Sequence, residues 1–227
     1  MFPGRQERWR RDPRAGVLAL AAGIGFAGFI ALAAGLLLAP AFMDADMAIS
    51  AAIRSIEFPG LDAFTRFATS VGDFWPIAFL TVITAAVLWV RGRRGEAVMV
   101  LVAVFGGVVL GAGLKQVFMR VRPALEVARL PLPETYSFPS GHALSSLLYF
   151  GSLAFVALLD VRRRRYATLI VAGCASAALA IAMSRVYLGV HYLGDVIGAW
   201  LLGFAWFSLV VLVGARWGAG LPEDANG

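Results

Sequence analysis

The chain has 227 residues, of which 60% are hydrophobic and only 15% are charged, whereas about 25% of the residues in soluble domains are charged. This composition excludes a soluble globular domain and predicts an integral membrane protein. Lys and Arg outnumber Asp and Glu by 20 to 14, but the excess lies in short segments between apolar runs, so no nucleic-acid partner is expected. The single cysteine, Cys174, cannot form an intrachain disulfide.

Six uncharged runs are long enough to cross a bilayer, which takes about 17–25 residues of helix. They predict an all-α fold, a six-helix transmembrane bundle in which residues 1–227 form one domain. The first run follows a basic segment, residues 1–15, as in a cleavable signal peptide. Its 24 residues exceed the usual apolar region of about 7–15 residues, so we expect a retained helix. The runs are residues 16–39, 74–90, 97–114, 143–159, 166–183 and 196–215.

Alternate crossings place thirteen of the 20 basic residues on one side of the membrane. The positive-inside rule makes this side cytoplasmic, so both termini are expected in the cytoplasm. A bacterial inner membrane is the expected location, and the site discussed below would face the periplasm. The thirteen residues are Arg5, Arg8, Arg10, Arg11, Arg14, Arg91, Arg93, Arg94, Arg162, Arg163, Arg164, Arg165 and Arg216.

The segment between the first two runs, residues 44–73, carries apolar residues at spacings of three and four. This pattern predicts two short amphipathic helices on the outer membrane surface, separated at Pro59-Gly60. A helix packed over the bundle and a lid that guides the substrate both fit the pattern. The apolar positions are Ile49, Ile53, Ile56, Leu61, Phe64, Phe67 and Val71.

Two cations lie at the outer end of the third run. Lys115 ends the run, and Arg122 follows seven positions later, directly before Pro123, which stops a helix. Such a pair could clamp a phosphate. A lysine and an arginine at a helix end are, however, more often anchors at the membrane interface.

Ser140, Gly141 and His142 immediately precede the fourth run. A Ser-Gly turn at a helix N-terminus offers a hydroxyl and backbone N–H groups, and the helix dipole adds to their attraction for an anion. His142 would lie in the first turn, next to the bound anion. The alternative is an ordinary N-cap serine with an interfacial histidine.

The fifth and sixth runs are connected by Ser184, Arg185, His191 and Asp195. If His191 and Asp195 begin the last helix, their spacing places them on one face. The carboxylate can then accept a hydrogen bond from one ring nitrogen and leave the other unprotonated and nucleophilic. A structural His–Asp pair is the alternative. The three polar groups share one predicted face and are complementary, because together they can hold a phosphate, attack it and protonate its leaving oxygen.

The three groups taken together resemble the tripartite signature of the type 2 phosphatidic acid phosphatase (PAP2) superfamily, which also contains the vanadium haloperoxidases and glucose-6-phosphatase. The match is complete and in the family's order, and it extends over residues 115–195. Three motifs in order are far more specific than any one of them. The motifs are Lys115-x6-Arg122-Pro123, Pro139-Ser140-Gly141-His142 and Ser184-Arg185-x5-His191-x3-Asp195.

The resemblance implies a role for each residue. His191 would attack phosphorus to form a phosphohistidine, Asp195 would hold and orient His191, and His142 would act as the general acid. Three fixed cations can neutralise the transferring phosphoryl group, so no metal and no cofactor is expected. The phosphate-binding residues would be Lys115, Arg122, Ser140, Gly141 and Arg185.

An outward-facing site near the head groups, bounded by the third to sixth runs, favours a lipid phosphate over a soluble sugar phosphate. The expected activity is that of a metal-independent lipid phosphatase. Phosphatidic acid, phosphatidylglycerol phosphate, undecaprenyl pyrophosphate and phosphorylated lipid A are all candidate substrates, since the signature reads only the phosphate. A lipid phosphotransferase and a non-catalytic lipid-binding or transport protein are the alternatives, and the oligomeric state is open.

Overall fold

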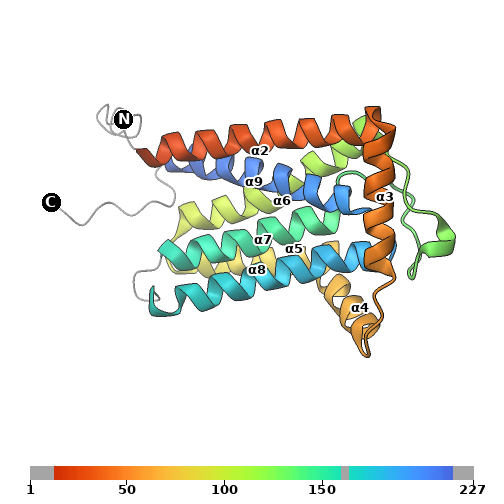
Figure 1. Cartoon of the computed structure of the whole chain (residues 1–227). Helices are drawn as coiled ribbons and strands as arrows, with labels where there is room; N and C mark the ends of the chain where they lie inside the picture. Colours follow the sequence, from red (N-terminus) through yellow and green to blue (C-terminus); the bar gives the residue numbers. More distant parts are fainter. Residues whose placement is uncertain (1–12, 160–163, 217–227) are drawn as a thin grey trace.

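The structure, a computed structural model, describes residues 13–159 and 164–216. These residues form eight α-helices and one short 3-10 helix, with no strand among them (Figure 1). The predicted all-α class is confirmed. In chain order the helices are α2 (Pro13–Leu38), α3 (Pro40–Arg54), α4 (Leu61–Val71), α5 (Phe74–Val90), α6 (Arg94–Phe118), η1 (Leu125–Val127), α7 (Gly141–Leu159), α8 (Arg164–Tyr187) and α9 (Leu193–Arg216).

Each of the six predicted apolar runs corresponds to one long helix, namely α2, α5, α6, α7, α8 and α9. Five of them are long and apolar enough to cross a membrane alone. The helix α5, with 17 residues, reaches that length only together with α4, from which it is bent by 53°. The described residues therefore contain five spans, or six if this bent pair counts as one.

The bundle is built on close packing between α2 and α9 and between α7 and α8. Glycines allow the first of these contacts, because a Cβ on Gly25 would lie 2.9 Å from the carbonyl oxygen of Leu201. At the end of the bundle covered by α3, three aromatic rings pack into the core, with Phe138 5.3 Å from Phe29 and 5.2 Å from Phe118 between ring centroids. Phe138 thus anchors the segment that precedes α7 onto the bundle.

The helices α3 and α4 are the two short helices predicted for residues 44–73, and α3 lies across the end of the bundle (Figure 1). Gly60 separates them with a φ of 82°, and Ile56 lies beyond the end of α3. Their buried faces are polar, carrying Asp46 and Ser50 in α3. Several apolar side chains face outward, such as Phe64 and Phe67, which are 53% and 68% exposed, whereas Ile53 packs against the core. This arrangement suits helices whose apolar faces contact lipid.

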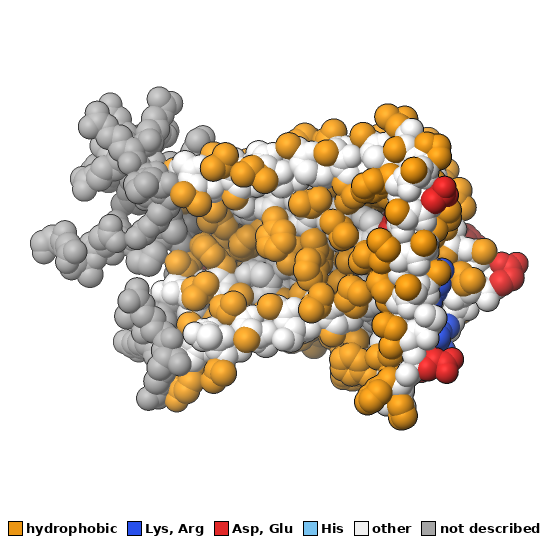
Figure 2. Space-filling model, in the orientation of Figure 1, with side chains coloured by type: hydrophobic (Ala, Val, Ile, Leu, Met, Phe, Trp, Pro, Cys, Tyr) orange, Lys and Arg blue, Asp and Glu red, His pale blue; other side chains and the backbone are white. Residues whose placement is uncertain are grey.

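The sides of the bundle and the end covered by α3 differ in composition. Figure 2 shows hydrophobic side chains along the sides of the molecule and charged ones at the end covered by α3. The motif residues at the end of α6, the start of α7 and the connection between α8 and α9 lie at this same end (Figure 1).

The opposite end of the bundle holds the described part of the predicted cytoplasmic basic group. Arg91 follows α5, Arg93 directly precedes α6, which begins at Arg94, and the helix termini with Arg14, Arg164, Arg165 and Arg216 are here too. Arg5, Arg8, Arg10, Arg11, Arg162 and Arg163 lie outside the described residues.

Candidate active site

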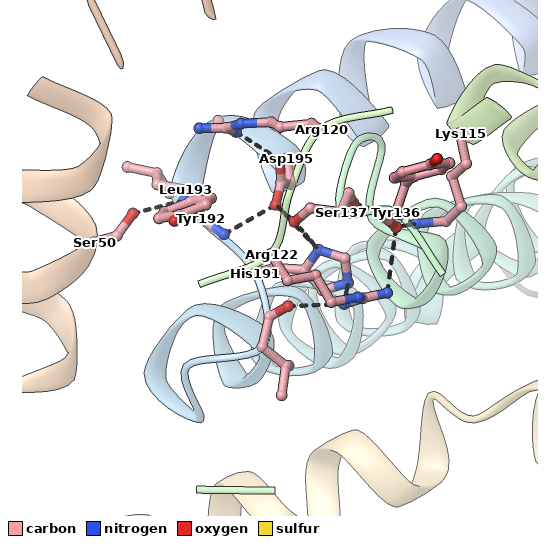
Figure 3. Close-up of polar contacts among 12 residues, drawn as sticks. Ser50, Lys115, Arg120, Arg122, Tyr136, Ser137, His191, Tyr192, Leu193 and Asp195 are labelled. Carbon is pink, nitrogen blue, oxygen red and sulfur yellow. Dashed lines mark hydrogen bonds and ion pairs between the residues drawn. The ribbon is translucent and has the colours of Figure 1, made fainter. Parts of the chain in front are cut away.

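His191 and Asp195 form a buried pair between α8 and α9 (Figure 3). The helix α8 ends at Tyr187 and α9 begins at Leu193, so His191 precedes α9 by two residues instead of lying inside it. The predicted contact forms nonetheless. Nδ1 of His191 lies 3.1 Å from Oδ2 of Asp195. The side chain of His191 is 3% exposed and that of Asp195 is 0% exposed.

The turn that carries His191 is fixed by a glycine and by backbone hydrogen bonds. Gly189 has a φ of 72°, and a Cβ there would lie 2.3 Å from the carbonyl oxygen of Val127, so only glycine fits. The carbonyl oxygen of Arg185 accepts hydrogen bonds from the N–H groups of Val190 and His191, at 3.1 and 3.2 Å. The last turn of α8 therefore positions the His191 backbone.

The contacts of His191 define which ring nitrogen is unprotonated. A carboxylate only accepts hydrogen bonds, so Nδ1 carries the proton shared with Asp195 and Nε2 carries a lone pair. The NH1 group of Arg122 donates to Nε2 at 3.2 Å, and the hydroxyl of Ser137 donates to Asp195. Burial lowers the pKa of His191 to about 3, so the imidazole is neutral at neutral pH.

Lys115 and Arg122 lie next to this pair and bind carbonyl oxygens of the segment before α7. Lys115 Nζ donates to the Tyr136 carbonyl at 2.6 Å. Arg122 donates from Nε to the Thr135 carbonyl at 2.6 Å and from NH1 to the Val190 carbonyl at 2.8 Å. Arg122 is thus held beside Nε2 of His191, and Lys115 shares the Tyr136 carbonyl with Arg122. A phosphate oxygen can replace these neutral acceptors with a stronger, charge-assisted bond.

Several buried polar atoms at this end of the bundle have no hydrogen-bond partner among the described residues, Nε of Arg120 and NH1 of Arg54 included, and two of them belong to the predicted phosphate-binding set. These two are the hydroxyl of Ser140, a residue that is 0% exposed, and Nε of Arg185. The NH1 group of Arg185 donates to the hydroxyl of Thr69 in α4. An unsatisfied buried polar group costs about 1–3 kcal/mol, which makes these two atoms natural partners for an anion.

His142 lies in the first turn of α7, as predicted, and its Nε2 donates to Oδ1 of Asp73 at 2.8 Å. Gly141, His142 and Lys115 line one end of a cavity of about 370 Å³ whose other walls are mostly apolar. Those walls come from α5, α6 and α7, which are the second to fourth runs. The motif residues themselves come from α6, α7 and the connection between α8 and α9, which are the third to sixth runs.

The predicted residues converge on one region. The charges of Arg122 and Arg185 act electrostatically on both His142 and His191, and also on Lys115. Within residues 13–159 and 164–216, no three His, Cys, Asp or Glu side chains are grouped as metal ligands would be. The region combines three cations, two imidazoles and a helix N-terminus, which is what binding and transfer of a phosphoryl group require.

Comparison with known proteins identifies the family. The sequence profile of the PAP2 superfamily matches residues 96–218. The chain belongs to the PAP2 superfamily. Phosphatidylglycerophosphatase B of Bacillus subtilis (strain 168) is 31% identical over 173 residues, which cover 75% of this chain and 83% of that protein.

Two further comparisons extend this PAP2 assignment. An undecaprenyl-diphosphatase of Sulfolobus acidocaldarius is 34% identical over 132 residues, covering 56% of this chain and 59% of that protein. The crystal structure of a transmembrane PAP2 type phosphatidylglycerolphosphate phosphatase from Bacillus subtilis superimposes with a TM-score of 0.73 and 29% identity. That match covers 84% of this chain and 94% of the other.

Several residues outside the predicted PAP2 set contact it directly. Asp73 holds His142, Ser137 donates to Asp195, and Arg120 donates from NH1 to Asp195 at 2.6 Å. Asp46 and Ser50, in α3, contact the start of α9. The only signal in the sequence for this last contact was the spacing of Asp46 and Ser50, four positions apart in a mainly apolar helix that also carries Asp44 and Arg54.

Proposed function

We propose that this PAP2 protein is a metal-independent membrane phosphatase that releases phosphate from a lipid phosphate monoester or pyrophosphate through a phosphohistidine. The observation that carries the proposal is the buried pair in which Asp195 holds Nδ1 of His191 while Nε2 points at Arg122. An imidazole held in this tautomer is a nucleophile, and the guanidinium beside it binds phosphate.

The phosphate is bound first. Its oxygens replace the loop carbonyls as acceptors for Lys115 and Arg122, and they also accept from Arg185. The hydroxyl of Ser140 and the N–H of Gly141, at the N-terminus of α7, complete the set. When Arg122 turns toward the phosphate, Nε2 of His191 is released from it and can approach phosphorus.

The transfer then takes place in two steps. Nε2 of His191 forms a bond to phosphorus as the bond from phosphorus to the leaving oxygen breaks, and His142 donates its proton to that oxygen. In the second step His142 takes a proton from water, the hydroxide attacks phosphorus, and the bond to Nε2 breaks to release inorganic phosphate. Asp73 serves as the counter-ion of His142 while it is protonated.

The cavity supports a lipid substrate. It begins at Lys115 and His142 and continues between α5, α6 and α7 along apolar residues that include Ile77, Val104 and Val108. A phosphate at the polar end would leave an acyl or prenyl chain among the apolar walls. The relatives are named for phosphatidylglycerol phosphate and undecaprenyl diphosphate, so these two lipids are the first to test.

The sidedness of the reaction follows from the basic residues. Arg91, Arg93 and Arg94 lie at the end of the bundle opposite the site. With the positive-inside rule this arrangement supports a site at the outer face, which would be the periplasmic face of an inner membrane.

Phosphate release by the purified, detergent-solubilised protein tests the function. The panel is phosphatidic acid, phosphatidylglycerol phosphate, undecaprenyl pyrophosphate and phosphorylated lipid A, each with EDTA, for the wild type and His191→Ala. We expect phosphate from at least one lipid with the wild type and none with the variant. Release by both proteins, or by neither, would contradict the proposal, and a phosphorylated acceptor in place of free phosphate would indicate a phosphotransferase.

A further inference from the structure

The outer helix α3 caps the helix that carries Asp195. The N-terminal N–H groups of a helix have no partners within it and need acceptors from elsewhere. At the start of α9, Ser50 Oγ accepts from the N–H of Leu193 at 2.9 Å, and Asp46 Oδ1 accepts from the N–H of Gly194 at 2.7 Å. The caps therefore come from a different helix, about 145 positions earlier in the chain.

Gly194 allows this contact to be close. A Cβ at position 194 would lie 2.8 Å from Oδ2 of Asp46 and 3.0 Å from the side chain of Leu36. Only a residue without a side chain lets the Asp46 carboxylate reach the α9 backbone.

Arg120 connects the same carboxylate to Asp195 (Figure 3 shows its contact with Asp195). It donates from NH2 to Oδ2 of Asp46 and from NH1 to Oδ1 of Asp195, both at 2.6 Å, and its guanidinium lies 4.5 Å from the centroid of the Tyr192 ring. All three charged side chains are buried. Burial lowers the pKa of Arg120, but Asp195 and Asp46 together raise it above its ordinary value, so the guanidinium stays charged.

The contacts among Asp46, Arg120 and Asp195 determine the net charge next to His191. Oδ2 of Asp195 contacts His191 while Oδ1 binds Arg120. Arg120 alone would neutralise Asp195 and weaken its hold on an imidazole that becomes cationic when phosphorylated. Asp46 shares the guanidinium, so two carboxylates balance one cation and a net negative charge is left for His191.

We propose that Asp46 and Arg120 are positioning residues for phosphoryl transfer, fixing the orientation and the charge of Asp195, so that α3 is part of the catalytic apparatus. The inference rests on the proposed nucleophilic role of His191. The role proposed for Asp46 differs from that of a purely structural cap. Ser50 provides such a structural cap without a charge.

Asp46→Asn is the decisive variant, with Ser50→Ala and Asp44→Asn as controls. Asn keeps the shape of the cap and removes the charge, whereas Ser50→Ala removes a cap and no charge. Asp44 lies on the exposed face of the same helix. We expect kcat of Asp46→Asn to fall by about 10- to 100-fold, the range found for residues that orient metal-bound histidines. KM should stay within about twofold, and both controls should keep kcat within about threefold.

The double variant Asp46→Asn, Arg120→Gln shows whether Asp46 acts through Arg120. If Asp46 acts through Arg120, kcat of the double variant is no lower than that of Arg120→Gln alone. If the two residues act independently, the double variant loses the product of the two single fold-losses in kcat. Melting temperatures of all variants in detergent show which of them fold. If Asp46→Asn folds and keeps wild-type kcat, or if Ser50→Ala loses as much, the proposal is overturned. Activity in His191→Ala would instead overturn the proposed function.

Discussion

The charge state of His191 is set by burial, and this has a measurable consequence. Its side chain is 3% exposed, and burial lowers its pKa to about 3 despite the hydrogen bond to Asp195. An unfolded histidine has a pKa of about 6.5. Between these values the unfolded chain binds a proton that the folded chain does not bind, so stability falls as the pH falls from about 6.5 toward about 3.

The pH dependence of thermal unfolding tests this state. We expect the melting temperature of the wild type to fall between pH 6.5 and pH 4, with His191 contributing up to about 1.4 kcal/mol per pH unit. His191→Gln, which does not titrate, should show a shallower slope. Equal slopes for the two proteins would mean that His191 is protonated in the folded state.

We expect the loss of activity in Asp73→Asn to depend on whether the leaving oxygen must be protonated. Asp73 holds His142, the proposed general acid, at 2.8 Å. Asp73→Asn should slow hydrolysis of an alkyl phosphate by about 100-fold, within the range of general acid catalysis. Hydrolysis of p-nitrophenyl phosphate, whose leaving group needs no protonation, should slow by less than about fivefold. A uniform loss on both substrates in steady-state assays would indicate a structural role for Asp73 instead.

The signature residues could be predicted from the sequence because they stand at helix ends with fixed spacings. Their partners could not. Asp73 is 69 positions from His142, and Asp46 is 74 positions from Arg120. The residues next to Asp73 and Asp46 in the sequence do not indicate these contacts. The contacts form only when α3 and α4 pack against the bundle.

At the scale of elements, the long helices were predictable and their ends less so. The apolar runs predict all six long helices, but α6 continues to Phe118 and α8 to Tyr187, beyond the last uncharged residues. These extra turns carry Lys115 and Arg185 within helices. A run of uncharged residues ends at the first charge, whereas a helix can continue past it because Lys and Arg lay their aliphatic stems along the apolar surface and extend the charged group beyond it.

The contact between α3 and α9 makes one glycine critical. Gly194→Ala would place a Cβ 2.8 Å from the Asp46 carboxylate, so the carboxylate or α3 must shift and the contact with α9 is disturbed. We expect a loss of kcat of at least tenfold together with a lower melting temperature. Gly113→Ala is the matched control, because a Cβ there meets nothing within 4 Å. Its activity should be unchanged, and equal behaviour of the two variants would show that the α3 contact is dispensable.

At the scale of the whole molecule, the apolar sides and the charged end both suit a substrate that has an apolar chain and a phosphate. Hydrophobic side chains cover the sides of the bundle in the view of Figure 2. The cavity is lined by Lys115 and His142 and by apolar residues of α5, α6 and α7. A lipid can thus present its phosphate without leaving the bilayer, as a site at the head-group layer requires.

A bulky residue in the cavity should distinguish lipid from soluble substrates. Ala78 in α5 lines the cavity, so Ala78→Trp should raise KM for a long-chain lipid phosphate by about tenfold or more and leave p-nitrophenyl phosphate hydrolysis unchanged. Val98→Trp, in the groove at the other end of α6, is the control and should affect neither. An unchanged KM for the lipid in Ala78→Trp would show that the chain lies elsewhere.

The covalent intermediate tests the central claim most directly. Wild-type protein is mixed with ³²P-labelled lipid phosphate, quenched in alkali, which preserves phosphohistidine, and digested for peptide mapping by mass spectrometry. The predicted result is label on His191, formed within the first turnover and absent from His191→Ala. Rapid turnover with the label on another residue, or with no labelled protein at any time, would contradict the nucleophilic role of His191.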